Sequence, residues 1–74
     1  MKEHKIDVKG LQCPQPIVET ARAVNKAQSG DLIVVESTDE GFSSDIKAWC
    51  DKTGNELVKN EKRLSFWHVV IKKK

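Results

Sequence analysis

The sequence predicts an α/β fold, a two-layer α/β sandwich in which two helices cover one face of a mixed four-stranded sheet. Short runs of alternating or β-branched residues have the length of strands, and two longer segments carry apolar residues at the spacing of amphipathic helices. Their order along the chain is β-α-β-α-β-β. Because strand–helix–strand crossovers are right-handed, both helices should lie on the same face of the sheet. We expect residues 1–74 to form a single domain, since 74 residues leave no room for a second core.

The first part of the chain predicts one strand and one helix. His4–Val8 alternates between its two faces, which is typical of a half-buried strand. A helix is expected to begin at Pro14 or Pro16 and to continue to Gln28. Its apolar stripe consists of Ile17, Val18, Ala21 and Val24. Ser29-Gly30 should end this helix, because glycine readily adopts the left-handed conformation of a C-terminal cap.

The middle of the chain predicts a buried strand followed by a second helix. Leu32–Val35 is a continuous apolar run, which indicates a central strand or one covered on both sides. Thr38–Gly41 has the composition of a loop. The apolar residues that follow at helical spacing are Phe42, Ile46, Trp49 and Cys50. This second helix should end at Lys52–Gly54.

The C-terminal part predicts two strands, Asn55–Lys59 and Leu64–Lys72, joined by a tight connection at Asn60–Arg63. The last strand is apolar on both faces, although a sheet with helices on one side should show alternation. Two interpretations stay open for its outer face: a partly covered surface with scattered apolar residues, or a docking surface or dimer contact. We therefore expect a monomer or a weak dimer.

Composition argues against several classes of function, among them an RNA-binding domain, which is the last-ranked alternative. The chain has 13 basic and 11 acidic residues, a net charge of +2, which is too balanced to indicate direct nucleic-acid binding. Its apolar runs are shorter than the about 20 residues that span a bilayer, and Met1–Lys5 has no apolar signal core. We therefore expect a cytoplasmic protein with free thiols. Two cysteines 37 positions apart do not have the paired spacing of zinc ligands, and we expect no metal and no other cofactor.

The most informative motif is the segment Gly10-Leu11-Gln12-Cys13-Pro14-Gln15-Pro16, between the first strand and the first helix. It places Cys13 beside a helix N-terminus, at the sheet edge where ligands of α/β proteins gather. The loop at 38–44 and the turn at 60–63 should lie there too. Because a helix N-terminus contributes only about 0.3–1 kcal/mol to a nearby anion, a strongly acidic thiol is not implied.

Two kinds of residue bear on how Cys13 could react. Lys9, Lys62 and Arg63 could favour its thiolate if they lie at the same edge. His4 and His68, in contrast, are placed in strands away from the loop, so that no general base is evident. A presented thiol without an acid–base partner suits a carrier that exchanges groups with proteins bringing their own catalysts.

The motif resembles the signature of the SirA/TusA-like sulfur-carrier family: glycine, a small apolar residue, any residue, then cysteine-proline-any-proline. The resemblance covers essentially the whole chain. It implies that Cys13 accepts sulfane sulfur as a persulfide, and that Gly10, Pro14 and Pro16 shape its loop. The implied partners are a sulfur donor, either a cysteine desulfurase or a rhodanese-like protein, and a downstream acceptor protein. A peripheral contact with a membrane transporter is compatible with the family's roles in sulfur uptake.

Two questions stay open after the resemblance. The protein could act as a sulfurtransferase-type carrier, or as a redox-sensing or regulatory module that binds a partner without transferring sulfur. Cys50 has a counterpart in some family members, but here it shares the apolar stripe of the second helix. We therefore expect Cys50 to be buried, and its place along that helix argues against a disulfide with Cys13.

Overall fold

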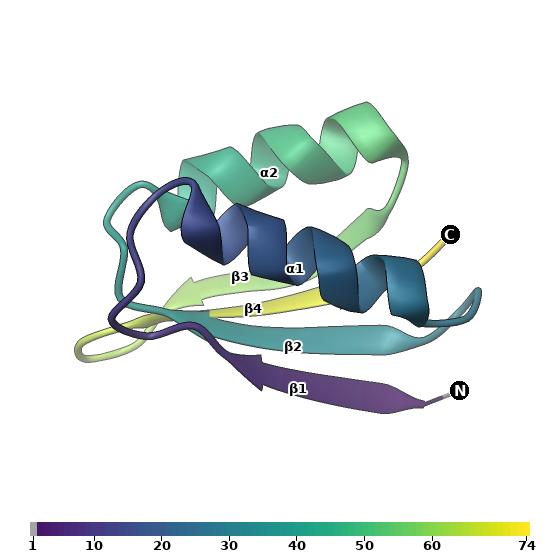
Figure 1. Ribbon diagram of the computed structural model, residues 1–74, viewed down its shortest axis with the longest axis horizontal. Helices are drawn as coiled ribbons and strands as arrows, with labels where there is room; N and C mark the ends of the chain where they lie inside the picture. The colour runs from purple at the N-terminus through teal and green to yellow at the C-terminus, as the bar shows by residue number, and fades with distance from the viewer. Residues whose placement is uncertain (1) are drawn as a thin grey trace.

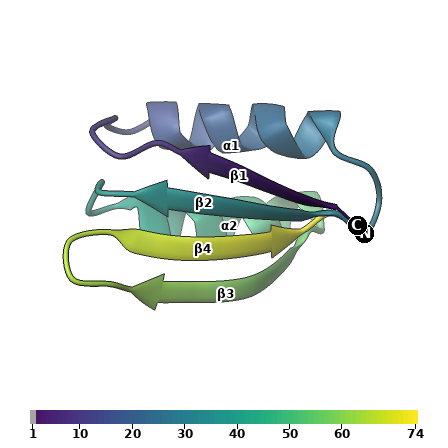
Figure 2. The ribbon, with the colours of Figure 1, turned by 90° about the horizontal axis from the view of Figure 1, so that it is seen from below.

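The computed structural model describes residues 2–74 and confirms the predicted order and class. In chain order the elements are β1 (Glu3–Asp7), α1 (Gln15–Lys26), β2 (Leu32–Ser37), α2 (Phe42–Thr53), β3 (Glu56–Lys62) and β4 (Trp67–Lys72). The sheet has the order β1-β2-β4-β3, with β1 and β2 parallel and the other pairs antiparallel. Both helices cover one face of the sheet (Figure 1), and the other face is free of helices (Figure 2). No helix within residues 2–74 is long and apolar enough to cross a membrane.

The core lies between the helices and the two central strands. Alternate residues of β2 and β4 point toward the helices, and the largest fully buried side chains include Ile33, Val35, Phe42, Ile46, Val69 and Ile71. The apolar run of β2 is therefore central in the sheet, as predicted, with its buried residues alternating along the strand. β-Branched residues suit this place because their stiff side chains pack well on a pleated surface.

The buried face of α1 differs from the predicted stripe. Its buried residues are Pro16, Thr20 and Val24, whereas Ile17 and Ala21 are only half-buried. Thr20 can be buried because its hydroxyl donates a hydrogen bond of 2.8 Å to the carbonyl oxygen of Pro16, one turn earlier. A stripe predicted from apolar residues alone omits such a threonine. The predicted buried face of α1 is therefore displaced around the helix from the observed one.

The end of α1 also differs from the prediction. The helix ends at Lys26, and Ala27 caps it in an extended conformation with its N–H directed at Ala23 and Val24 oxygens. Gly30 does have a positive φ of 87°, but it lies in the following turn. There its N–H donates to the carbonyl oxygen of Lys73.

The β3–β4 hairpin lies further along the chain than predicted. Residues 60–62 belong to β3, and the turn is closed by a hydrogen bond from the N–H of Arg63 to the oxygen of Phe66. Asn60 is tolerated in the strand because its side chain exchanges two hydrogen bonds with Ser43 of α2. Leu64, assigned by sequence to the last strand, lies instead in this turn and is fully exposed.

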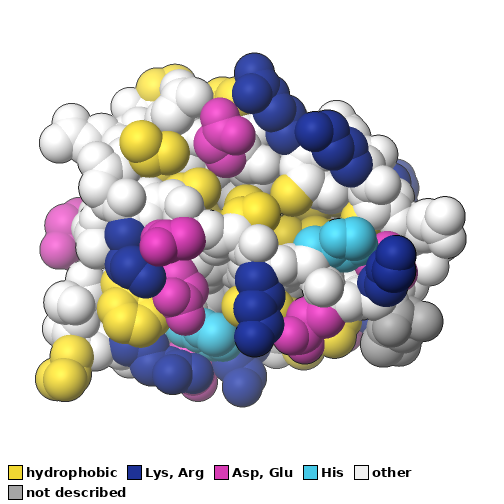
Figure 3. All heavy atoms as spheres, turned by 60° about the horizontal axis from the view of Figure 1, so that its bottom comes forward, with side chains coloured by type: hydrophobic (Ala, Val, Ile, Leu, Met, Phe, Trp, Pro, Cys, Tyr) yellow, Lys and Arg dark blue, Asp and Glu magenta, His cyan; other side chains and the backbone are white. Residues whose placement is uncertain are grey.

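The outer face of the sheet carries charged side chains among scattered apolar ones (Figure 3). Val34 and Val70 pair across β2 and β4 and are half-buried there. Beside them, Nδ1 of His68 lies 3.1 Å from Oε2 of Glu36. Figure 3 shows hydrophobic side chains separated by basic, acidic and histidine side chains rather than one continuous apolar patch. This arrangement agrees with scattered apolar residues on a partly covered face.

Asp31 connects the start of β1 to the turn after α1 through hydrogen bonds. Its carboxylate accepts hydrogen bonds from the backbone N–H groups of Lys2 and Gln28 and lies 2.9 Å from Nε2 of His4. The contact with His4, and then these two backbone N–H groups, hold the pKa of Asp31 well below its ordinary value of 3.8. The stability that follows is present above the ordinary pKa and is lost as the pH falls through the lowered one.

We expect Asp31→Asn to lower the stability at neutral pH and to flatten its decline in acid. Urea midpoints measured from neutral pH to below 3.8 test this. Glu56→Gln, at an exposed position, is the control and should keep the full acid dependence. An unchanged acid dependence in Asp31→Asn would show that other groups control it.

Candidate functional site

Cys13 lies in the loop between β1 and α1, at the edge where the parallel strands β1 and β2 end (Figure 1). Its side chain is exposed. The loop is held to the neighbouring β2–α2 loop by a 2.9 Å hydrogen bond from the N–H of Gly10 to Oγ1 of Thr38. Gly10 has a φ of 88°, a conformation that side chains other than glycine rarely adopt, while the space around it is open. Glycine is therefore required there by the backbone rather than by crowding.

The two loops line an open hollow of about 470 Å³. Its lining residues are Gly10, Leu11, Gln12, Cys13, Thr38, Asp39 and Glu40. The predicted proximity of Cys13 to the loop after β2 is thus confirmed. The hairpin turn does not line this hollow.

The two prolines of the motif occupy different environments. Pro14 is the exposed N-cap residue of α1 and follows a cis peptide bond, whereas Pro16 is fully buried against the core. Neither has an N–H, and the N–H of Gln15 donates to the oxygen of Gln12. None of these three residues can therefore offer an N–H to an anion at Cys13.

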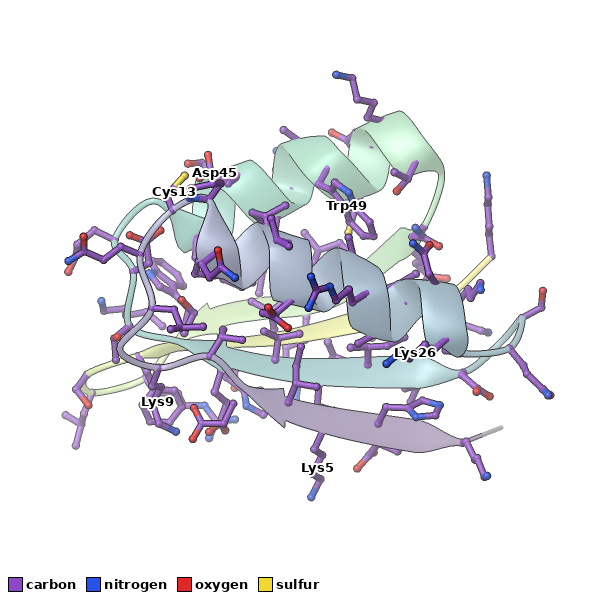
Figure 4. All side chains as sticks on the ribbon, viewed as in Figure 1. Lys5, Lys9, Cys13, Lys26, Asp45 and Trp49 are labelled. Carbon is purple, nitrogen blue, oxygen red and sulfur yellow. The ribbon has the colours of Figure 1, made fainter. Side chains whose placement is uncertain are left out.

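The closest polar partner of Cys13 is an acid on the second helix. Sγ of Cys13 lies 3.6 Å from Oδ2 of Asp45, in the first turn of α2, and Figure 4 shows the two side chains close together where the two helices begin. Partial desolvation, the hydrogen bond to Asp45 and the charges of Asp45 and Asp39 raise the pKa of Cys13 above its ordinary value of 9.0. These surroundings disfavour the thiolate form of Cys13.

The three cations named from the sequence are engaged elsewhere. Nζ of Lys9 lies 3.0 Å from Oε1 of Glu36, and Figure 4 places Lys9 at the level of the sheet, away from Cys13. Arg63 pairs with Glu61 at 2.6 Å. Nζ of Lys62 lies over the Trp67 ring, 5.0 Å from its centroid. The structure does not bring these cations together at the thiol, and the charges that act on it are acidic.

The other titratable groups considered from the sequence lie outside the hollow. Cys50 is 2% exposed, and burial, with a further effect of the Asp51 charge, raises its pKa to about 11. Both cysteines are free. His4 and His68 pair with Asp31 and Glu36, respectively. Among residues 2–74, no group of three or more histidine, cysteine or acidic side chains could hold a metal ion.

The sequence analysis assigned neither Asp39 nor Asp45 a role at the thiol. One signal could have indicated them: both flank the predicted start of the second helix, at the edge that also holds Cys13. Acidic residues are common in the first turn of a helix, so their presence alone suggests only capping.

Fold and loop together define a small α/β protein that presents one accessible thiol beside a helix start. Residues 4–73 match the family described as "Sulfurtransferase TusA". The chain belongs to this family.

Individual relatives agree with this assignment. The chain is 35% identical over 71 residues to "Sulfur carrier protein TusA" of Allochromatium vinosum, covering 96% of this chain and 93% of the relative. It is 41% identical over 71 residues to "Putative sulfur carrier protein YrkI" of Bacillus subtilis, covering 90% and 95%. The crystal structure of a SirA-like protein from Desulfitobacterium hafniense superposes with a TM-score of 0.79, over 97% of this chain and 96% of that one. At 20% identity, that likeness concerns the fold alone.

Proposed function

We propose that this protein is a sulfur carrier that accepts sulfane sulfur as a persulfide on Cys13 and relays it to an acceptor protein. The observation that carries the proposal is the exposed thiol in the Gly10–Pro16 loop, while the other cysteine is buried. The names of the relatives and the family match support it.

The transfer needs no cofactor. The sulfur of Cys13 attacks the terminal sulfur of a donor persulfide, R–S–SH. The S–S bond of the donor breaks, and R–SH and Cys13–S–SH result. The thiol proton passes to the departing R–S sulfur, so that atoms and electrons balance. In the second transfer an acceptor nucleophile attacks the outer sulfur of Cys13–S–SH and returns the free thiol.

The site supports a carrier that depends on its partners for activation. His4 and His68, which could act as general bases, lie outside the hollow and pair with acids. The hollow is open, so that a partner's active-site loop can reach the thiol. We infer a cysteine desulfurase or a rhodanese-like protein as donor, a second protein as acceptor, and action in the cytoplasm.

Mass spectrometry of the intact protein tests this function. Incubation with a cysteine desulfurase, its cofactor and cysteine should add the mass of one sulfur atom, and dithiothreitol should remove it. Peptide mapping should place the added sulfur on Cys13. Absence of the adduct with both a desulfurase and a rhodanese-like donor would overturn the proposal.

A further inference from the structure

The acidic surroundings of Cys13 raise a question that sulfur transfer alone does not answer. A nucleophilic cysteine is usually activated by positive charge, a helix N-terminus or a neighbouring base. Here Oδ2 of Asp45 lies 3.6 Å from Sγ. An oxygen of Asp39 and one of Asp45 each lie within 3.7 Å of the position that a Cβ on Gly41 would take, so both carboxylates are next to Gly41. The thiol is therefore in contact with the carboxylate of Asp45, and Asp39 lines the same hollow as Cys13.

We propose that Asp45 is a positioning residue that holds Cys13 of the free protein as a neutral thiol, with its S–H donated to the carboxylate. The direction of the hydrogen bond follows from chemistry, because an ionised carboxylate only accepts and the sulfur must carry the proton. A thiolate at this place would lose that bond and would meet like charge instead. The arrangement thus protects the exposed sulfur from unwanted reactions.

None of the groups named below brings a free positive charge to the thiol that would offset the two carboxylates. Asp45 faces it from α2, and Asp39 acts on it from the β2–α2 loop. On α1, Gln15 is hydrogen-bonded to Glu19. Within the β1–α1 loop, Nζ of Lys9 is bound by Glu36 at 3.0 Å and by Asp7 at 3.5 Å. A group that neutralises the two carboxylates would therefore increase the fraction of thiolate.

This inference deepens the proposed function, on which its biological meaning rests, but its test needs no sulfur donor. The rate of alkylation by iodoacetamide is measured against pH on the free protein, and each product is mapped to confirm that Cys13 is modified. Because only the thiolate reacts, the midpoint of this profile reports the ionisation of the thiol. A failure of sulfur transfer would leave the alkylation result unaffected.

We expect Asp45→Asn to move the midpoint to lower pH and to raise the alkylation rate at neutral pH about threefold or more, since each pKa unit is a factor of ten in thiolate. Asp45→Glu, which restores the charge, should lie closer to the unsubstituted protein. Asp39→Asn should move the midpoint in the same direction by less, because Asp39 acts through charge without a hydrogen bond. Glu40→Gln, in the same hollow, is the matched control and should leave the midpoint within error.

Far-UV circular dichroism and protection of Cys50 from alkylation identify variants that remain folded. If Asp45→Asn does not fold, Asp39→Asn provides the test. A folded Asp45→Asn, or in its place Asp39→Asn, whose midpoint equals or exceeds that of the unsubstituted protein would overturn the inference. A shift of the midpoint in Glu40→Gln as large as that in Asp45→Asn would also overturn the inference. The shift would then follow from the loss of any acidic charge in the hollow and not from the position of Asp45 at the thiol.

Discussion

Cys13→Ser should abolish sulfur loading completely, so that no adduct of one sulfur mass forms with any donor and no sulfur reaches an acceptor. A serine oxygen cannot form a persulfide, and a hydroxyl without an adjacent base is a weak nucleophile. The substitution is close to isosteric at an exposed position, so the fold should not change. The measurement is the intact mass after incubation with donor, together with transfer of labelled sulfur to an acceptor.

Cys50→Ala is the matched control for this loss. Cys50 is 2% exposed, and its pKa is raised to about 11, so it is neither accessible nor ionised at neutral pH. Loading of the Cys50→Ala protein should therefore equal that of the unsubstituted chain. A persulfide that forms on the Cys13→Ser protein but not on the Cys50→Ala protein would show that Cys50, and not Cys13, is the carrier.

The Cys13→Ser variant also distinguishes a sulfur carrier from a redox-sensing or regulatory module. A carrier loses its cellular effect with Cys13→Ser, because the sulfur atom itself is the cargo. A module that only binds its partner would keep both binding and effect, since serine preserves the shape of the loop. Partner binding that persists while the sulfur-dependent effect disappears is the expected combination.

The sequence was sufficient for the order of elements but not for the register of the last hairpin. Apolar alternation assumes that every second residue shares a face, yet the pairing shifts between Leu57 and Lys59 and leaves Val58 as an extra, exposed residue. After this bulge Asn60 faces the helices and bonds to Ser43. From the sequence alone, a polar residue such as Asn60 indicates a turn, because its hydrogen-bond partner Ser43, 17 positions away, is not evident.

A similar limit applies to the candidate site. The motif located the thiol, because the cysteine and prolines are adjacent in the chain and their local geometry is determined by a few residues. Its electrostatics depend on Asp45, 32 positions away, and on ion pairs that hold Lys9 and Arg63 elsewhere. Such pairings follow from tertiary contacts, and a list of nearby charges does not determine them.

Phe42→Ala should have the largest effect on stability. The side chain is fully buried at the first residue of α2, and truncation of a buried phenylalanine costs about 3–5 kcal/mol. For 74 residues, a stability of 0.05–0.15 kcal/mol per residue amounts to about 4–11 kcal/mol. The substitution therefore removes a large share of the total. Urea unfolding followed by the fluorescence of the half-buried Trp49 and Trp67 measures the loss.

Leu64→Ala is the control for this truncation, since Leu64 is fully exposed in the hairpin turn and should change stability by less than about 0.5 kcal/mol. Equal urea midpoints for the two variants would refute the placement of Phe42 in the core.

The Phe42→Ala substitution should also change the reactivity of the Cys13 thiol. The N–H of Phe42 donates to the oxygen of Asp39, and Asp45 lies three residues further along α2. Loosening this first turn separates the carboxylates from Cys13, so any folded fraction of Phe42→Ala should alkylate faster at neutral pH, in the direction expected for Asp45→Asn.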